Sequence, residues 1–370
     1  ATCHILMNQD ELKYWVALSQ FSKVGPMRFK RIDAYFPTFE EAWTASLAEY
    51  LRAGIDEEVA TEIVARRGEI NPDEELEKLS KEKVAAVTLK DDLYPKLLKE
   101  IYNPPPILYY KGALEQDEFA VAVVGTRKCS PYGKQTTGEI SGELASAGLT
   151  VVSGLAVGID TLAHQAALDC GGKTIAVLGA GLDAKNIYPV VNRYLADKIV
   201  ASGGTLFSEY PLGTMPLKFN FPQRNRIIAG LTLGTLVVEA PLSSGALITA
   251  KFALEFNREV FAVPGSIYSE NSLGPNNLIK MGAKLIAGAS DIIEALNLQQ
   301  AVEFTEAKKI VPDSKNEAIL LPLLSKEPVH IDALIKQSGL DTPTVNSTMT
   351  LMEIKGKVRN LGGSNYVLAR

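Results

Sequence analysis

The chain contains little cysteine, little histidine and no long hydrophobic run. Its three cysteines, Cys3, Cys129 and Cys170, are scattered, odd in number and without a CxxC pair. This argues against a zinc ribbon or a disulfide framework and favours a reducing compartment. No run of about 18 uncharged apolar residues occurs, so we expect no transmembrane helix, and the first ten residues lack the pattern of a signal peptide. The sequence therefore predicts a cytoplasmic protein with no membrane contact, no metal and no cofactor.

An overall excess of positive charge is also missing, since the net charge of the 370 residues is -5. This argues against a protein that coats DNA over its whole surface, but not against a local basic patch. Two stretches, residues 119–138 and 210–238, contain no acidic residue. The basic residues in these two stretches are Arg127, Lys128, Lys134, Lys218, Arg224 and Arg226. Together with the aromatic rings of Phe219 and Phe221, they predict a site for a phosphate-bearing ligand, with nucleic acid as the leading candidate.

The length predicts two or three domains. Residues 1–80 have the pattern of short helices separated by a Gly-containing turn, which fits a SAM-like or helix-hairpin-helix module and equally a plain helical bundle. Over residues 81–298, short apolar runs alternate with helical segments. Continuous apolar strands separated by helices predict a parallel sheet covered on both faces, an extended Rossmann-like α/β fold with extra strands at its start.

The end of the chain has a different pattern. Residues 299–314 are polar and predict a linker. Residues 315–370 predict three helices and a Gly-Gly hairpin, the outline of a winged helix. The third helix, expected over residues 342–355, occupies the recognition position but carries few basic residues before Lys355. DNA binding and a protein-contact or autoregulatory role both remain open for this domain.

The candidate site residues follow the predicted strands, where an open α/β sheet binds its ligands. In the RNR segment we expect Arg224 to face the ligand and Arg226 to be structural, paired with a carboxylate such as Glu239. Ser243, Ser244 and Gly245 either bind phosphate at a helix start or only cap that helix. Further candidate contacts are Lys128 and Gly154.

Two other patterns point to chemistry that we consider less well supported. Residues 179–184 match a dinucleotide fingerprint, but they follow the third core strand and a Tyr-Pro pair interrupts the expected helix. Asp160 and His164 share a helix face, yet no nucleophile motif accompanies them. We expect a plain turn and a packed histidine, respectively. If the KFNF segment is extended, Phe219 and Phe221 lie on the same side.

Several segments together resemble the DNA-processing protein A family (DprA, also called Smf). These are GTRKCSPYG, SGLAVGIDTLAH, FSEYPLG, FPQRNRIIAGL, VVEAPLSSGALITAKFALEFNREVFAVPG and NSLGPNNLIKMGA, within residues 94–295. The resemblance implies a non-enzymatic protein that binds and protects single-stranded DNA during natural transformation and helps to load RecA recombinase. It also implies that the protein works beside single-strand-binding protein and forms a homodimer through the Rossmann-like domain. Carried onto this chain, the DNA-binding residues are Gly125, Thr126, Arg127, Lys218, Phe221, Arg224 and Asn225.

An enzymatic alternative remains from the same superfamily. Nucleotide phosphoribohydrolases carry the signature P-G-G-x-G-T-x-x-E, and residues 230–239 read GLTLGTLVVE. This segment keeps Gly234, Thr235 and Glu239 but lacks the Pro-Gly-Gly opening. Glu239 is therefore either a hydrolytic carboxylate or, as we favour, a structural one.

Overall fold

The computed structural model describes residues 9–115, 119–299, 313–324, 329–355, 357–360 and 363–368. The chain forms two compact units, one ending at Asn297 and the other beginning at Leu298. The predicted linker over residues 299–314 lies largely outside the described residues. Within the described ranges, none of the helices is long and apolar enough to cross a membrane.

The first unit is built around a sheet of nine strands in the order β1-β2-β6-β5-β4-β3-β7-β8-β9. Strands β3 to β9 run parallel to one another, whereas β2 pairs antiparallel with both β1 and β6 at one edge. This confirms the predicted parallel sheet with extra strands at its start. The strands are Ala85–Thr88 (β1), Ile107–Gly112 (β2), Ala120–Val124 (β3), Thr150–Ser153 (β4), Thr174–Leu178 (β5), Thr205–Ser208 (β6), Gly234–Val237 (β7), Glu259–Ala262 (β8) and Lys284–Leu285 (β9).

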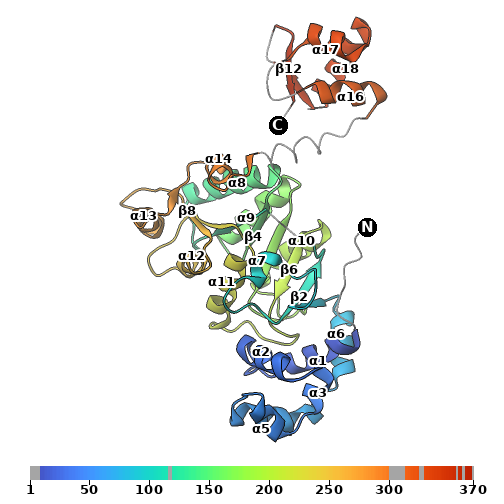
Figure 1. Ribbon diagram of the computed structural model, residues 1–370. Coiled ribbons are helices and arrows are strands. Elements are labelled where there is room, and N and C mark those ends of the chain that lie inside the picture. The colour runs from blue at the N-terminus through green and yellow to red at the C-terminus, as the bar shows by residue number, and fades with distance from the viewer. Residues whose placement is uncertain are drawn as a thin grey trace. The chain divides into compact units, whose positions relative to one another are not determined.

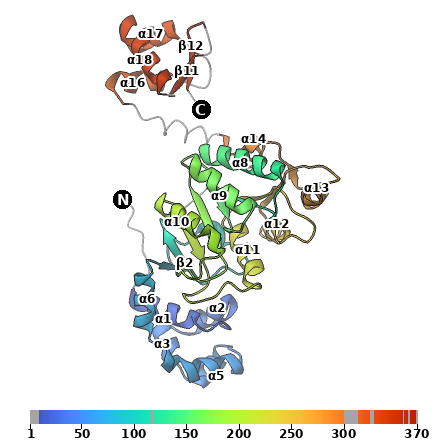
Figure 2. The same ribbon diagram turned by 180° about the vertical axis from the view of Figure 1, so that it is seen from behind.

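Helices cover both faces of this sheet (Figures 1 and 2). Successive residues of a strand face opposite sides; in β5, Ala176 and Leu178 join one hydrophobic cluster while Ile175 and Val177 join another. The helices that connect or follow the strands are Lys96–Lys99 (α7), Pro131–Ser146 (α8), Ile159–Asp169 (α9), Arg193–Ala201 (α10), Asn220–Gly230 (α11), Ala246–Glu255 (α12), Leu273–Lys280 (α13) and Ala289–Ala295 (α14).

The N-terminal segment is helical and packs beside the antiparallel edge of the sheet (Figure 1). Trp15 stacks on Phe39 with 4.1 Å between ring centroids, and their core cluster continues into the sheet through Tyr109. Ser46 and Glu49 form a capping box at the start of α4, which satisfies backbone N–H groups that the helix leaves free. The helices are Gln9–Ser19 (α1), Pro26–Tyr35 (α2), Phe39–Thr44 (α3), Leu47–Arg52 (α4), Glu57–Arg66 (α5) and Pro72–Lys81 (α6).

The strand order creates a switch point between β3 and β7. The chain runs outward from β3 through β4 and β5 to β6, then returns through α11 to β7 on the other side of β3. The loops after β3 and β7 therefore separate at the carboxyl edge, the place where open α/β sheets bind ligands.

The second unit has a winged-helix topology, as predicted. Its hydrophobic core includes Leu334 and Met349, both fully buried. The elements are Lys315–Leu320 (α16), Val329–His330 (β10), Ile331–Ser338 (α17), Thr342–Ile354 (α18), Val358–Asn360 (β11) and Asn365–Leu368 (β12). The three strands form a sheet in the order β10-β12-β11.

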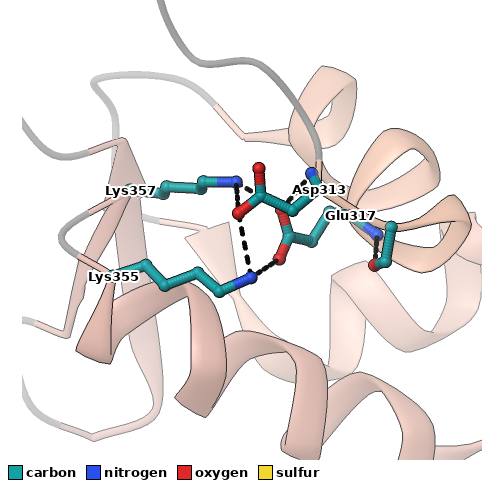
Figure 3. A network of polar contacts seen from close by, with 5 residues as sticks. Asp313, Glu317, Lys355 and Lys357 are labelled. Atoms are coloured by element: carbon teal, nitrogen blue, oxygen red, sulfur yellow. Dashed lines mark hydrogen bonds and ion pairs between the residues drawn. The ribbon is translucent and has the colours of Figure 1, made fainter.

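A buried carboxylate ties the ends of this unit together (Figure 3). Glu317 is 2% exposed and accepts hydrogen bonds from Lys355 at 2.9 Å and Lys357 at 2.6 Å, both of which also contact Asp313. Burial alone would raise the pKa of the Glu317 carboxyl, but these bonds and one from the Asp313 backbone outweigh it and lower that pKa to about 2. Lys355 and Lys357, which follow the recognition helix, are thus engaged by carboxylates within the unit.

Candidate nucleic-acid interface

A cavity of about 710 Å³ opens at the switch point of the sheet. Its walls come from the loop after β3, the start of α9, the N-terminal half of α11 and the start of α12. The predicted site residues that line it are Gly125, Thr126, Arg127, Lys128, Lys218, Phe221, Arg224, Asn225, Ser244 and Gly245. The structure therefore brings together residues from segments more than 100 positions apart.

The loop after β3 presents two cations to this cavity. A side chain at Gly125 would place its Cβ 2.5 Å from Ile159 and 2.8 Å from the Glu239 carbonyl oxygen, so only glycine allows this close approach. The Thr126 N–H donates to that same carbonyl at 2.6 Å, and the Thr126 hydroxyl accepts from the Lys128 N–H at 3.2 Å. These contacts fix the loop, while the Arg127 and Lys128 side chains remain exposed.

On the opposite wall, Lys218 lies two residues before α11, and Phe221 lies in the first turn of that helix. The Asn220 side chain donates to the Gly179 carbonyl at 3.0 Å and the helix starts there, so the KFNF segment is not extended and the condition for Phe219 and Phe221 to share a side is not met. The Lys218 side chain is exposed. The Phe221 ring is half-buried, and the Arg127 guanidinium lies 5.8 Å from its centroid. Phe219 is instead 63% exposed and is not among the lining residues.

Arg224 forms part of the cavity floor and does not project into solvent. It is 5% exposed, and its Nη1 donates to the carbonyls of Gly154, at 2.9 Å, and Val177. Burial lowers the pKa of its guanidinium to about 10 although Asp160 opposes that shift. Asp160 in turn accepts from the Gly154 N–H at 3.0 Å, and burial raises the pKa of its carboxyl. Arg224 and Asp160 thus place opposite charges beneath the loop after β4.

The expected pairing of Arg226 with Glu239 is wrong. Arg226 forms its ion pair with Glu209 and donates to the Asn103 carbonyl at 2.7 Å. Glu239, 2% exposed, accepts from the Ser130 N–H at 2.8 Å and the Ser130 hydroxyl at 2.5 Å. Neither residue is among those that line the cavity. Glu239 therefore holds the start of α8 against the end of β7.

His164 is a packed core residue, as expected. It is fully buried and its Nδ1 lies 2.7 Å from the Thr174 hydroxyl. Burial lowers its pKa to about 3, with a further contribution from the Arg224 charge, so the ring is neutral near pH 7. Asp160 bonds to backbone N–H groups and is not paired with this ring.

The remaining predicted contacts divide between wall and rim. Gly154 lines a narrow extension of the cavity. The Ser244 hydroxyl accepts from the Ala246 N–H at 3.3 Å, in keeping with the capping alternative, while Ser243 is exposed and outside the lining. Sequence reasoning missed Tyr188 and Ala156, which also line the cavity. Their position after β5 and β4, at the ligand edge of the sheet, was the available signal.

Comparisons with known proteins agree with this architecture. A sequence model of the family described as DNA recombination-mediator protein A matches residues 85–297, and one described as DprA winged helix domain matches residues 305–364. Protein Smf of Synechocystis sp. is 37% identical over 97% of this chain and 99% of its own length. DNA processing protein DprA of Streptococcus pneumoniae is 50% identical over 58% of this chain and 76% of its own length.

Solved structures give the same result. The X-ray structure of DprA from Streptococcus pneumoniae superposes with a TM-score of 0.65 at 39% identity, covering 78% of this chain and 98% of that one. DNA processing protein A of Helicobacter pylori, described for its single-stranded DNA binding mode, gives a TM-score of 0.52 at 31% identity, covering 58% of this chain and 96% of that one. The chain belongs to the DNA recombination-mediator protein A family, the DprA/Smf group of DNA-processing proteins.

Proposed function

We propose that this protein binds single-stranded DNA in the cavity at the switch point of its sheet. The observation that carries the proposal is the placement of two exposed cations, Arg127 and Lys218, around a half-buried aromatic ring, Phe221, in one cavity. Cations that neutralise phosphates and rings that stack on bases are the two elements of single-strand binding. The single-stranded DNA binding named for the Helicobacter pylori relative supports the same assignment.

The other predicted site residues take supporting roles in this proposal. Gly125 allows the loop after β3 to approach Ile159 closely, and the Thr126 N–H fixes the loop by donating to the Glu239 carbonyl, so that the loop presents Arg127 to a phosphate. The Arg224 guanidinium donates to the Gly154 carbonyl, which fixes the loop after β4, and it places a positive charge beneath the ligand. Asn225 donates to the Gly245 carbonyl at 3.1 Å, which joins α11 to the start of α12 beside the site.

We further propose that the bound strand is delivered to recombination. Membership of a recombination-mediator family supports a role in loading RecA recombinase on the strand during natural transformation, with protection of the strand before loading. In this account the protein acts in the cytoplasm, as a homodimer formed through the Rossmann-like domain, and meets strands covered by single-strand-binding protein. It works by binding and without catalysis.

A titration with labelled oligonucleotides tests the binding assignment. The full-length protein is titrated with a single strand and with a duplex of equal length, while release of base from a nucleoside monophosphate is assayed in parallel. We expect much tighter binding of the single strand, because a cavity of this size accepts splayed bases and not a stacked duplex. Equal affinity for both forms, or hydrolysis of the monophosphate, would count against the proposal.

A further inference from the structure

A second cavity lies at the free edge of the nine-stranded sheet, away from the proposed DNA site. Strand β1 ends this sheet, and β2 is its one strand partner within the described part of the chain. The cavity has a volume of about 410 Å³, and its walls come from β1, β2 and the N-terminal helices α1 and α6. The outer side of the edge strand is therefore hollowed and not covered by a packed helix.

The cavity wraps around β1 and does not lie on one face of the sheet. Leu76 of α6 and Ala86 of β1 pack against the hydrophobic cluster on one face, whereas Tyr110 of β2 packs against the cluster on the other. All three residues line the same cavity. The hollow thus occupies the place where a further strand would pair with β1.

Backbone groups of β1 point into this place. In an antiparallel pair, residues that bond to the partner strand alternate with residues whose N–H and C=O point away from it. The Leu89 N–H donates to the Pro106 carbonyl at 3.1 Å, just beyond the paired residues. By alternation, Ala86 and Thr88 face outward. The Thr88 N–H donates to the Asp91 carboxylate at 2.7 Å, but no bond to the outward groups of Ala86 is found among the described residues.

From these observations we propose that β1 is a docking edge for an extended, basic segment of another protein, which adds a strand to the sheet. Main-chain bonds to Ala86 hold the segment, its apolar side chains cover Leu12 and Leu76, and its lysine or arginine side chains reach the rim of the cavity. This interaction goes beyond the proposed DNA binding and does not depend on it.

The charge of the cavity selects a basic partner. Three of its lining residues are acidic and, within the described part of the chain, none is basic. The wall helix α6 carries four acidic residues and two lysines. On the rim, Asp73 bonds to Lys13 at 2.8 Å, and Glu77 bonds to the lysine one turn later in α6 at 2.9 Å. Each carboxylate has a second oxygen and further lone pairs for a partner's donor.

The same charge argues against a second copy of this chain as the partner. Pairing β1 with its counterpart in another copy would bring two acidic rims together, and like charges on adjacent strands are destabilising. A basic segment of a different protein instead places opposite charges across the new strand pair. The edge is therefore assigned to a hetero-partner.

The test uses short, capped and labelled peptides, titrated by fluorescence anisotropy against the full-length protein. One peptide alternates lysine with valine, and a second alternates glutamate with valine. A third has the lysine–valine sequence with all of its backbone N–H groups methylated, so that it cannot donate bonds to an edge strand. The second peptide tests the charge of the partner, and the third tests strand addition.

Three variants locate the peptide on the protein. Ala86→Pro removes an N–H that points away from β2, a position where an edge strand tolerates proline. Asp73→Asn/Glu77→Gln removes the two rim charges. Glu69→Gln/Glu74→Gln is the matched control, because both residues are exposed and outside the cavity lining. Melting curves report folding, and the oligomeric state of each protein is measured by light scattering.

We expect the parent to bind the lysine–valine peptide and neither of the other two. Ala86→Pro should weaken this binding by roughly 2- to 12-fold, the range for one hydrogen bond. The Asp73→Asn/Glu77→Gln protein should weaken it by roughly 2- to 30-fold, the range for two exposed ion pairs, and the control should bind like the parent.

No binding by the parent, or equal binding of the methylated peptide, would overturn strand addition even if Ala86→Pro fails to fold. Equal binding of the glutamate–valine peptide would overturn the basic partner. An oligomeric state that changes in Ala86→Pro would assign the edge to a second copy. Much tighter peptide binding after deletion of residues 1–8 would assign it to the chain itself. Either of these last two results would contradict the proposal.

Discussion

At the scale of single residues, charge and aromatic surface are divided between different side chains of the cavity. Lys218 is exposed and offers only charge, whereas Phe221 is half-buried and offers a ring. The two can therefore be removed separately, and each removal has its own thermodynamic signature.

Phe221→Ala should weaken single-strand binding by about 1–3 kcal/mol with little change in salt dependence, because stacking releases no counterions. Lys218→Ala should instead lower the slope of log K against log salt by about one unit, as expected for one lost phosphate contact. Titrations at four salt concentrations measure both quantities. If the Phe221→Ala protein unfolds while its remaining folded fraction binds normally, the ring belongs to the core.

A second residue-scale prediction concerns Glu239. The two Glu239 carboxylate oxygens each accept from one donor of Ser130, and in Glu239→Gln an amide NH₂ replaces one of them, so we expect a loss of stability of about 1–3 kcal/mol. Chemical denaturation measures this loss, and Ser243→Ala, a change at an exposed residue later in the same loop, is the control. The parent should not hydrolyse nucleoside monophosphates. Reproducible hydrolysis that disappears in Glu239→Gln would make this carboxylate catalytic.

At the scale of elements, the positions of the strands were more predictable from the sequence than the partners of individual side chains. Buried parallel strands are continuous apolar runs, and β3 (AVAVV) and β5 (TIAVL) are such runs that the sequence alone shows. The pairing of Arg226 depends instead on which carboxylate lies beside α11 once that helix has packed against the sheet. Glu209 follows β6 and Glu239 follows β7, and three strands separate β6 from β7.

The same dependence on tertiary contacts explains why the sequence did not reveal the start of α11 or the position of Tyr188. The KFNF alternation would place both rings on one side of an extended segment, but the Asn220 side chain bonds to Gly179, a residue 41 positions earlier, and α11 begins at Asn220. Tyr188 belongs to the site only because its loop returns to the cavity after β5. Both are consequences of long-range contacts, which local periodicity does not contain.

The winged helix gives a prediction about pH. The pKa of Glu317 is lowered to about 2 in the folded unit from an ordinary 4.5, so its stabilising contribution is present above pH 4.5 and is lost as the pH falls toward 2. At neutral pH, Glu317→Gln should lower the stability of this unit by about 1–3 kcal/mol. Calorimetric melts of parent and variant between pH 7 and pH 2.5 should show that difference closing only below pH 4.5. A difference that stays constant to pH 2.5 would contradict the role of the charged network.

At the scale of the whole molecule, an acidic chain uses a local basic site. The net charge is -5, yet residues 119–138 and 210–238 contain no acid, and the fold places four of their six cations, Arg127, Lys128, Lys218 and Arg224, around one cavity. The overall charge disfavours indiscriminate binding of polyanions, so affinity depends on the few cations at the switch point.

The central claim, that this cavity binds single-stranded DNA, is tested most directly by removing one exposed cation from each of two opposite walls. The full-length Arg127→Ala/Lys218→Ala protein and the parent are titrated with one single-stranded oligonucleotide over a range of salt concentrations. A second double variant, Lys30→Ala/Lys251→Ala, removes two exposed lysines outside the cavity lining. The account predicts that the slope of log K against log salt falls by about two units in the first variant and is unchanged in the second. Parent-like affinity and slope in the Arg127→Ala/Lys218→Ala protein would contradict it.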